Sequence, residues 1–412
     1  MLNVSRRSLL IGAGGAAVSP AVAKTYKRAM TEHVAIIGAG AFGAWTAHHL
    51  LQSGHKVTLI DAHGPAHSRA SSGGESRLTR AAYGKDAIYT RMARDSLPQW
   101  QALSAISGLP IFIPAGILFF FETDEPYLHD SIAAHQEFGL PTEVLNAAEM
   151  ARRFPMIDFD GVVSGLHEPA FGVLMARRAV QTLVERFVRD GGTYLKGAAL
   201  PPVASAETLE EIRLTSGETI RADRFVYALG PWLPTLFPDV IGPRIRPTRQ
   251  EVFYFASPAG DRRFLPGTMP GWADFNGGDM FYGTPDLEAR GVKFAYDRHG
   301  VAVDPDTQDR RPTEAALADV VAFRDRRFPA LIGAQLIGAE VCQYENSSNG
   351  DFLIDLHPQL ANVLLVGGGS GHGLKHGPEV GRYAARRLFS EANAEPRFSL
   401  ATKGETHHRE VH

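Results

Sequence analysis

The spacing of apolar positions near the start of the chain predicts a strand, a helix and a second strand. The runs from His33 to Ile37 and from Lys56 to Ile60 are short, apolar and rich in β-branched residues, which is typical of buried strands. Ala41 to Gln52 between them has the length and the apolar spacing of a helix. Strand, helix and strand in this order make a βαβ unit, from which Rossmann-type nucleotide folds are built.

Later segments predict that this nucleotide fold is assembled from distant parts of the chain. Phe225 to Leu229 and Val363 to Val366 are further short apolar strands, and a helical pattern runs from Pro378 to Phe389. Between Arg246 and Tyr344 the sequence is instead rich in aromatic residues and punctuated by Gly and Pro. That texture predicts antiparallel strands over a ligand site.

The first 30 residues differ from the rest. Ser5 to Leu10 contains a twin-arginine pattern, Leu9 to Val18 is apolar but too short to span a bilayer, and Ala21 to Ala23 offers small residues for cleavage. This order predicts a twin-arginine export signal and linker over residues 1–29, recognised by the matching export machinery, and a periplasmic protein. A cytoplasmic protein that begins at Met30 is the alternative.

Composition narrows the partners to small molecules. The chain has 412 residues and a formal net charge of -3, without the basic face that nucleic-acid binding requires. No transmembrane segment is expected. Cys342 is the single cysteine, so neither an intramolecular disulfide nor a cysteine metal cluster can form, and no histidine spacing indicates a metal site.

A glycine motif lies at the turn between the first strand and the first helix. Gly38, Gly40 and Gly43 match G-x-G-x-x-G, in which the glycines permit the tight turn, the approach of a pyrophosphate and close helix packing. The phosphates then meet the N-terminus of the helix. Asp61 ends the second strand, where a carboxylate can bind ribose hydroxyls. These features predict a dinucleotide site.

Further motifs decide between dinucleotides. In chain order they are Ser71 to Tyr83, Arg249-Gln250, Val341 to Tyr344, Asp351 to Asp355 and Ser370 to Lys375. They resemble a Ser-rich flavin segment, a substrate-domain signature, a flavin-attachment site with the segment that follows it, and a C-terminal flavin loop. All belong to the D-amino-acid oxidase superfamily, and within it to the monomeric sarcosine oxidase and N-methyltryptophan oxidase group. The resemblance runs from about residue 32 to 390.

The resemblance implies FAD as the cofactor and a fold of two domains. The first is a Rossmann-type α/β FAD-binding domain built from discontinuous segments, and the second is an α+β substrate domain with an antiparallel sheet. The expected ranges are 31–112, 173–245 and 345–392 for the FAD-binding domain, 113–172 and 246–344 for the substrate domain, and 393–412 for a polar, frayed tail.

The residues that the motifs and the resemblance assign to FAD are Gly38, Gly40, Ala41, Phe42, Gly43, Asp61, Ser71, Ser72, Cys342, Gly371, His372, Gly373 and Lys375. Among them Cys342 matches the attachment site. A thiolate is a strong nucleophile and can form a thioether with the flavin 8-methyl carbon. A buried, inert thiol is the alternative for Cys342.

Five residues are expected at the reacting end of the flavin. By resemblance, Lys293 serves oxygen activation and Arg77 is a neighbouring arginine, since fixed cations favour the reduced flavin. Arg80 and Lys375 are expected to hold the substrate carboxylate, and Tyr344 to border the same pocket. The alternatives are a surface cation at Lys293 or Arg77 and an ordinary ion pair at Arg80.

The sequence departs from the family pattern near the substrate. Gly73 and Asp297 stand where sarcosine oxidases carry histidines, and His299 lies two residues after Asp297. An acid near the amine suits a cationic or polyhydroxylated substrate better than sarcosine.

The function that the resemblance implies is oxidation of a secondary amine or N-substituted amino acid. The product is an imine that hydrolyses, with oxygen reduced to hydrogen peroxide. One alternative is an FAD dehydrogenase that passes electrons to a quinone or carrier protein. A second is a non-catalytic flavin-binding chaperone or assembly factor. The oligomeric state is not predicted.

Overall fold

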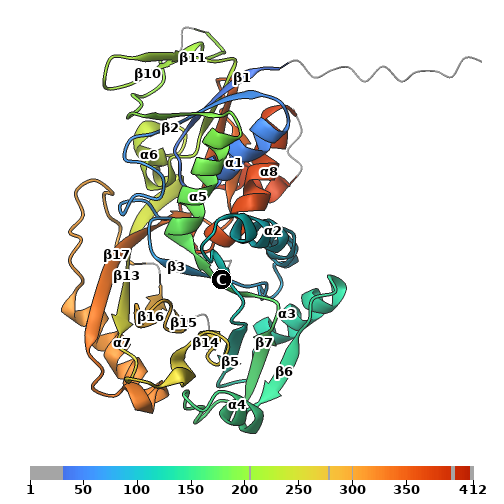
Figure 1. Cartoon of the computed structure of the whole chain (residues 1–412). Coiled ribbons are helices and arrows are strands. Elements are labelled where there is room, and N and C mark those ends of the chain that lie inside the picture. The colour runs from blue at the N-terminus through green and yellow to red at the C-terminus, as the bar shows by residue number, and fades with distance from the viewer. Residues whose placement is uncertain (1–30, 204–205, 277–278, 299, 391–394, 409–412) are drawn as a thin grey trace, which may run out of the picture. The chain divides into compact units, whose positions relative to one another are not determined.

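The structure is a computed structural model that describes residues 31–203, 206–276, 279–298, 300–390 and 395–408. The predicted export signal, Met30 and His299 lie outside the described residues. Glu32–His412 forms one unit, which holds both of the large sheets (Figure 1). No helix of the described residues combines the length and the apolar character needed to cross a membrane.

The first sheet has six strands and surrounds the predicted βαβ unit. In spatial order they are β18 (Leu353–Leu356), β19 (Val363–Gly367), β12 (Arg224–Tyr227), β1 (His33–Ile37), β2 (Lys56–Asp61) and β9 (Thr193–Lys196). All neighbouring pairs are parallel except β18 and β19. Strands from four distant parts of the chain meet here, so the prediction of a discontinuous Rossmann-type sheet is confirmed.

Helices pack against this sheet through apolar side chains. They include α1 (Ala41–Gln52), α5 (Ala176–Arg189) and α8 (Gly377–Leu388), and α2 (Ala87–Ile106) packs in turn on α5 and α8. Gly381 of α8 allows the close approach of α1, because a Cβ at this position would lie 2.5 Å from the backbone of Trp45. The bounds of β1 and α1 equal the predicted ones, since local apolar spacing determines both.

The second sheet has eight strands. In spatial order they are β17 (Leu336–Ser347), β13 (Ile245–Phe255), β16 (Val292–Asp297), β15 (Asp279–Thr284), β14 (Gly271–Asn276), β5 (Ile117–Phe121), β7 (Ser164–Glu168) and β6 (Glu143–Asn146). It is antiparallel, as predicted, apart from the parallel pair of β14 and β5. Trp272 and Phe294 of this sheet pack with Phe323 of α7 (Glu314–Arg327) in one aromatic core.

Smaller elements complete the fold. Two further sheets contain β3 (Ser76–Thr79), β8 (Gly172–Met175) and β4 (Phe112–Ile113), and the hairpin β10 (Glu211–Arg213) and β11 (Thr219–Arg221). The remaining helices are α3 (Pro126–Glu137), α4 (Ala147–Arg153) and α6 (Leu233–Leu236), with the 3-10 turns η1 (Gly230–Trp232), η2 (Gly242–Arg244), η3 (Arg262–Phe264), η4 (Pro329–Leu331) and η5 (Leu374–His376).

The two large sheets follow the predicted domain ranges, but the boundaries do not separate compact bodies. The strand β17 continues three residues past the expected boundary at Tyr344 and so reaches into the range assigned to the FAD-binding domain. A strand that begins in one region and ends in the other ties the two regions together. The exact domain limits therefore stay a prediction.

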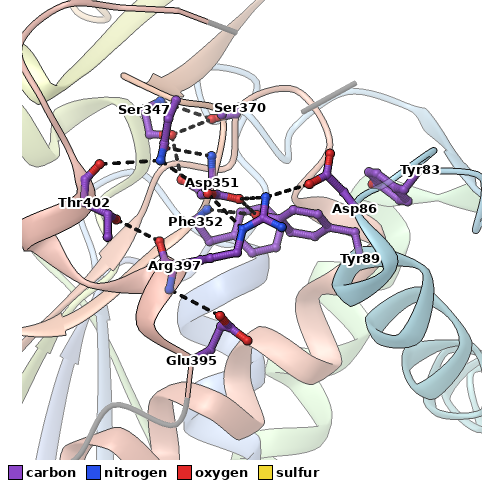
Figure 2. Close-up of polar contacts among 12 residues, drawn as sticks. Tyr83, Asp86, Tyr89, Ser347, Asp351, Phe352, Ser370, Glu395, Arg397 and Thr402 are labelled. Carbon is purple, nitrogen blue, oxygen red and sulfur yellow. Dashed lines mark hydrogen bonds and ion pairs between the residues drawn. The ribbon is translucent and has the colours of Figure 1, made fainter. Parts of the chain in front are cut away.

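The C-terminal segment differs from the expected frayed tail. The turns η6 (Pro396–Phe398) and η7 (Leu400–Thr402) follow one another, and Phe398 is fully buried. Arg397 contacts Asp351 and Asp86 at 2.8 Å each (Figure 2). The expectation of a frayed tail is wrong for residues 395–408, because one apolar ring and one paired guanidinium fix a segment that is otherwise polar.

Candidate active site

A cavity of about 360 Å³ opens at the carboxyl ends of β1, β2 and β12. Ligands of open α/β sheets bind at this edge. The expected residues that line the cavity are Gly38, Gly40, Ala41, Phe42, Asp61, Ser71, Ser72, Arg77, Tyr344, Gly371 and Gly373. The cavity therefore joins the dinucleotide motif to residues predicted at the flavin ring.

The glycine turn has the geometry that the motif requires. Gly38 has a φ of +107°, which L side chains rarely adopt, and a Cβ there would overlap the backbone of Ala228. Gly43 does not line the cavity but packs against the Gly38 carbonyl, where a side chain would not fit. Asp61 accepts hydrogen bonds from the backbone of Ala39 and His63 at 2.7 and 2.8 Å. Gly40, Ala41 and Phe42 at the start of α1 line the cavity, and the first N–H groups of a helix have no partner within it.

Arg77 and Cys342 meet near the other part of the cavity. Arg77 donates hydrogen bonds of 2.8 Å each to the carbonyl oxygens of Ser76 and Ser71. The Cys342 Sγ lies 3.6 Å from Arg77 Nη2 and 3.7 Å from the Ser71 oxygen, and the side chain is buried. The thiol of Cys342 therefore lies within contact distance of the Arg77 guanidinium.

Lys293 is fully buried on β16, so the surface-cation alternative does not hold for it. Its Nζ donates a hydrogen bond of 2.9 Å to the Ser76 carbonyl oxygen and lies 5.4 Å from the centre of the Tyr282 ring. Burial, and then the charge of Arg77, lowers the pKa of Lys293 to about 7. The Lys293 side chain can therefore gain or lose a proton near neutral pH.

Arg80 and Lys375, the two expected carboxylate ligands, both lie against the aromatic ring of Tyr83. The Arg80 guanidinium lies 4.3 Å and the Lys375 Nζ 5.2 Å from the centre of the Tyr83 ring, and both cations are buried. Lys375 donates to the His372 carbonyl oxygen at 3.1 Å. Burial and then Arg80 hold the pKa of Lys375 well below its usual value. An anion between these residues would favour the charged lysine.

Asp297 is also part of this group, as an acid in a place where the family pattern has histidine. The Tyr344 hydroxyl donates a hydrogen bond of 2.8 Å to Asp297 Oδ1, and both residues are buried. Burial and the Asp297 charge raise the pKa of Tyr344 well above its usual value. The structure thus brings Arg80, Lys375, Tyr344 and Asp297 together.

The C-terminal glycine loop lies against the cavity through Gly369, Gly371, Gly373 and Leu374, whereas Ser370, His372 and Lys375 do not line it. Gly371 has a φ of +81°, and a Cβ there would lie 2.6 Å from the Tyr344 ring. His372 does not line the cavity. Its Nδ1 lies 3.1 Å from the Tyr83 hydroxyl and its ring stacks on Phe352. The His372 side chain therefore packs against other side chains of the protein and not in the cavity.

Comparisons with known proteins identify the family of this chain. The family described as "FAD dependent oxidoreductase" (DAO) matches residues 33–387. The chain belongs to the DAO family of FAD-dependent oxidoreductases. An N-methyl-L-tryptophan oxidase from Citrobacter koseri is 30% identical to this DAO-family chain, over 85% of the chain and 92% of the relative. A monomeric sarcosine oxidase from Arthrobacter sp. is 27% identical, over 91% and 93%.

Solved structures share the fold of this DAO-family protein. L-proline dehydrogenase from P. horikoshii superposes with a TM-score of 0.78 at 20% identity, covering 90% of this chain and 97% of its own. Fructosyl amine:oxygen oxidoreductase (Amadoriase I) from Aspergillus fumigatus has a TM-score of 0.74 at 22% identity, covering 91% and 92%. The likeness confirms the predicted fold class.

The residues around the cavity fit FAD. A backbone with close-packed glycines faces the space at the α1 N-terminus, as a pyrophosphate needs. Arg77, which is partly buried, lines the cavity, and the buried Lys293 shares the Ser76 carbonyl with it. Fixed cations at these positions would favour the reduced form of a bound flavin. The single cysteine of this DAO-family chain is beside them.

Two buried acids at or near the site were not predicted from the sequence. Glu345 lines the cavity on β17, and burial raises the pKa of its carboxyl to about 7 against the hydrogen bonds of the Gly368 and Gly369 N–H groups. Glu168 ends β7 beneath the segment that carries Arg80, with 1% of its surface exposed. A lone glutamate in a strand normally indicates a solvent-facing position.

Proposed function

We propose that this DAO-family protein oxidises the C–N bond of a secondary amine or N-substituted amino acid. The observation that carries the proposal is the pair of buried basic side chains, Arg80 and Lys375, against the Tyr83 ring. Asp297, the hydrogen-bond partner of the cavity-lining Tyr344, interacts electrostatically with both basic side chains. Two cations in an apolar setting call for an anionic partner. The names of the sarcosine and N-methyltryptophan oxidases support an amino-acid carboxylate as that partner.

Arg80 and Lys375 have different roles in binding the substrate. Arg80 binds the substrate carboxylate through its planar fork of donors, and Lys375 adds a point charge that is strengthened once the anion is present. Orientation of the substrate in this way lowers the barrier before any bond is broken. Bound FAD supplies the acceptor for the two electrons and the hydrogen that leave the carbon next to nitrogen. The imine that is released hydrolyses in water.

Oxygen is the proposed final electron acceptor, with hydrogen peroxide as the product. Lys293 and Arg77 place two positive charges where a superoxide-like partner would be stabilised. An FAD dehydrogenase that reduces a quinone or a carrier protein is the competing proposal. Peroxide formed in step with substrate loss favours the oxidase, whereas anaerobic bleaching of the flavin without peroxide in air favours the dehydrogenase.

Asp297 points to substrates larger and more polar than sarcosine. A buried acid that already accepts the Tyr344 hydroxyl can also bind a cation or hydroxyl groups on the nitrogen substituent. We infer a preference for amino acids with such substituents. Purified protein is screened for peroxide with N-methyl amino acids, cyclic imino acids and glycated amino acids. Failure of every amine to bleach the flavin favours a flavin-binding chaperone.

Covalent FAD and export complete the proposal. Cys342 is proposed to carry the flavin as a thioether, supported by the adjacent Arg77 at 3.6 Å. The twin-arginine pattern of the leader supports export by the machinery that moves folded proteins, which suits a protein that acquires FAD in the cytoplasm. Fractionation of cells that express the full chain, with and without the Arg6-Arg7 pair, tests this localisation.

A further inference from the structure

A buried carboxylate supports Arg80 from outside the substrate pocket. Glu168, the last residue of β7, has 1% of its surface exposed and does not line the cavity. Its Oε1 accepts a hydrogen bond of 2.8 Å from the backbone N–H of Ala81, and the N–H of Ala82 also donates to this carboxyl. The carboxylate therefore fixes the two residues that directly follow Arg80.

The segment that Glu168 fixes also holds the Arg80 guanidinium. Arg80 Nη1 donates to the carbonyl oxygen of Ala82 and to the Tyr127 hydroxyl at 3.3 Å, and that hydroxyl donates to the same carbonyl at 2.6 Å. The aromatic face against the guanidinium belongs to the next residue, Tyr83. The direction of Arg80 thus depends on a backbone that Glu168 holds.

A histidine lies in contact with Glu168. His135 of α3 places its Nε2 3.3 Å from Glu168 Oε1, and its Nδ1 lies 2.9 Å from the Thr142 hydroxyl. Both His135 and Glu168 are almost fully buried. Burial raises the pKa of Glu168, while His135, the two backbone N–H groups and Arg80 act in the opposite direction. The contacts with Ala81 and His135 are both made by Oε1, whereas Oε2 has no hydrogen-bond partner among the described residues. The position of Glu168 is therefore fixed through Oε1.

Charge gives Glu168 a second effect on the same residues. Arg80 is the cation that, after burial, most disfavours the charged form of Lys375, and Glu168 and Asp297 oppose that effect. Glu168 and Asp297 offset part of the repulsion between the two cations before a substrate binds. A substrate carboxylate can then bind without first separating Arg80 from Lys375.

We propose that Glu168 is a positioning residue that holds Arg80 for the substrate carboxylate and so selects amines that carry one. The inference rests on the proposed function, in which Arg80 binds that carboxylate. Glu168 itself touches neither the substrate nor FAD. Its role is exerted through the backbone of Ala81 and Ala82.

The test compares holoenzymes with Glu168→Met and Glu168→Gln. Methionine fills the same space without an acceptor, whereas glutamine keeps an oxygen for the two N–H groups. The dissociation constant of acetate, a carboxylate that the flavin does not oxidise, is read from changes in flavin absorbance. KM and kcat are measured for an N-methyl amino acid and for the matching N-methylamine without a carboxylate.

We expect Glu168→Met to weaken acetate binding and raise the KM for the amino acid about tenfold, with kcat within about threefold. Glu168→Gln is expected to remain within about threefold of the parent protein. Neither change should alter the FAD content or the reaction of the amine without a carboxylate. Glu143→Met is the control, because Glu143 pairs with His167, the residue before Glu168 on β7, and its replacement perturbs the same strand without removing a hydrogen bond to Ala81.

Unchanged acetate binding in Glu168→Met would overturn the inference, and so would an equal loss for amines with and without a carboxylate. If Glu168→Met does not accumulate as folded holoenzyme, Glu168→Asp replaces it. The shorter acid withdraws its oxygen from Ala81, and a loss of three- to tenfold confined to carboxylates is expected, whereas no loss contradicts the role. Failure of the parent protein to bind any carboxylate would instead refute the proposed function of Arg80.

Discussion

Lys293 and Arg77 donate hydrogen bonds to one acceptor, the backbone carbonyl oxygen of Ser76, at 2.9 and 2.8 Å. Two cations at one carbonyl repel each other, and here Lys293 is fully buried while Arg77 is partly buried. Burial and this repulsion lower the pKa of Lys293, because an ammonium can lose its proton while a guanidinium keeps it. A proton that is available near neutral pH therefore lies beside the expected flavin ring.

Replacement of Lys293 by Met is expected to slow flavin reoxidation by roughly 100-fold or more while substrate reduction of the flavin changes little. The cation stabilises charge on the oxygen species and contributes little to amine oxidation. Stopped-flow mixing of reduced enzyme with oxygen, set against anaerobic mixing of oxidised enzyme with substrate, separates the two steps. Equal slowing of both would contradict the assignment.

The pH dependence of reoxidation should follow the same residue. The pKa of Lys293 is lowered to about 7, so its ammonium is charged below that pH and neutral above it. Reoxidation in the parent protein is therefore expected to fall as pH rises through about 7 and to be flat in Lys293→Met. A profile that rises through this range would reverse the proposed role of the cation.

Replacement of Cys342 by Ser should leave a protein that releases its flavin on denaturation. The chain has a single cysteine, so no other thiol can form the thioether. Acid precipitation followed by the flavin absorbance of pellet and supernatant measures the outcome, with the parent protein expected to give a yellow pellet. Flavin that stays attached to the serine variant would exclude Cys342 as the attachment site.

Asp297→Asn should change substrate preference more than overall turnover. The amide can still accept the Tyr344 hydroxyl, but it loses the charge that would bind a cationic substituent. We expect kcat/KM to fall about tenfold for substrates with a cationic or polyhydroxylated nitrogen substituent and by less than about threefold for sarcosine. A uniform decrease across both classes would show that the acid does not contact the substituent.

Arg397→Ala is expected to lower the free energy of unfolding by about 1–3 kcal/mol, because Asp351 and Asp86 lose their partner while one third of the arginine remains in solvent. Burial already raises the pKa of Asp86, so its charge depends on that partner. Urea denaturation measures the change. Arg311→Ala, which removes an exposed pair with Asp309, is the control and should leave the free energy of unfolding unchanged.

Local sequence patterns were sufficient for much of the fold and for the cofactor motif. The βαβ unit and the glycine turn depend on spacing within a few residues, and they agree with the structure to within one residue. Arg80, Lys375 and Tyr344 were brought together in advance only by resemblance to a family, because they lie far apart in the chain.

Residues whose role depends on distant partners could not be predicted in this way. Glu168 is buried because Ala81, 87 positions earlier, and His135 on another element surround it. Phe398 lies in a polar stretch, and only the packed core reveals that it is buried. His372 matches a flavin loop in sequence, yet its ring faces Tyr83 rather than the cavity.

The place of β1 in the six-stranded sheet has a consequence for biosynthesis. Its neighbour β12 and the next strand, β19, are made much later than β1, and at roughly 5–20 residues per second β19 follows β1 by tens of seconds. During that time the nascent chain exposes unpaired strand edges, which are prone to aggregation. The cleft for FAD is complete only when nearly the whole polypeptide has left the ribosome, so cofactor capture is a post-translational event that chaperones would have to protect.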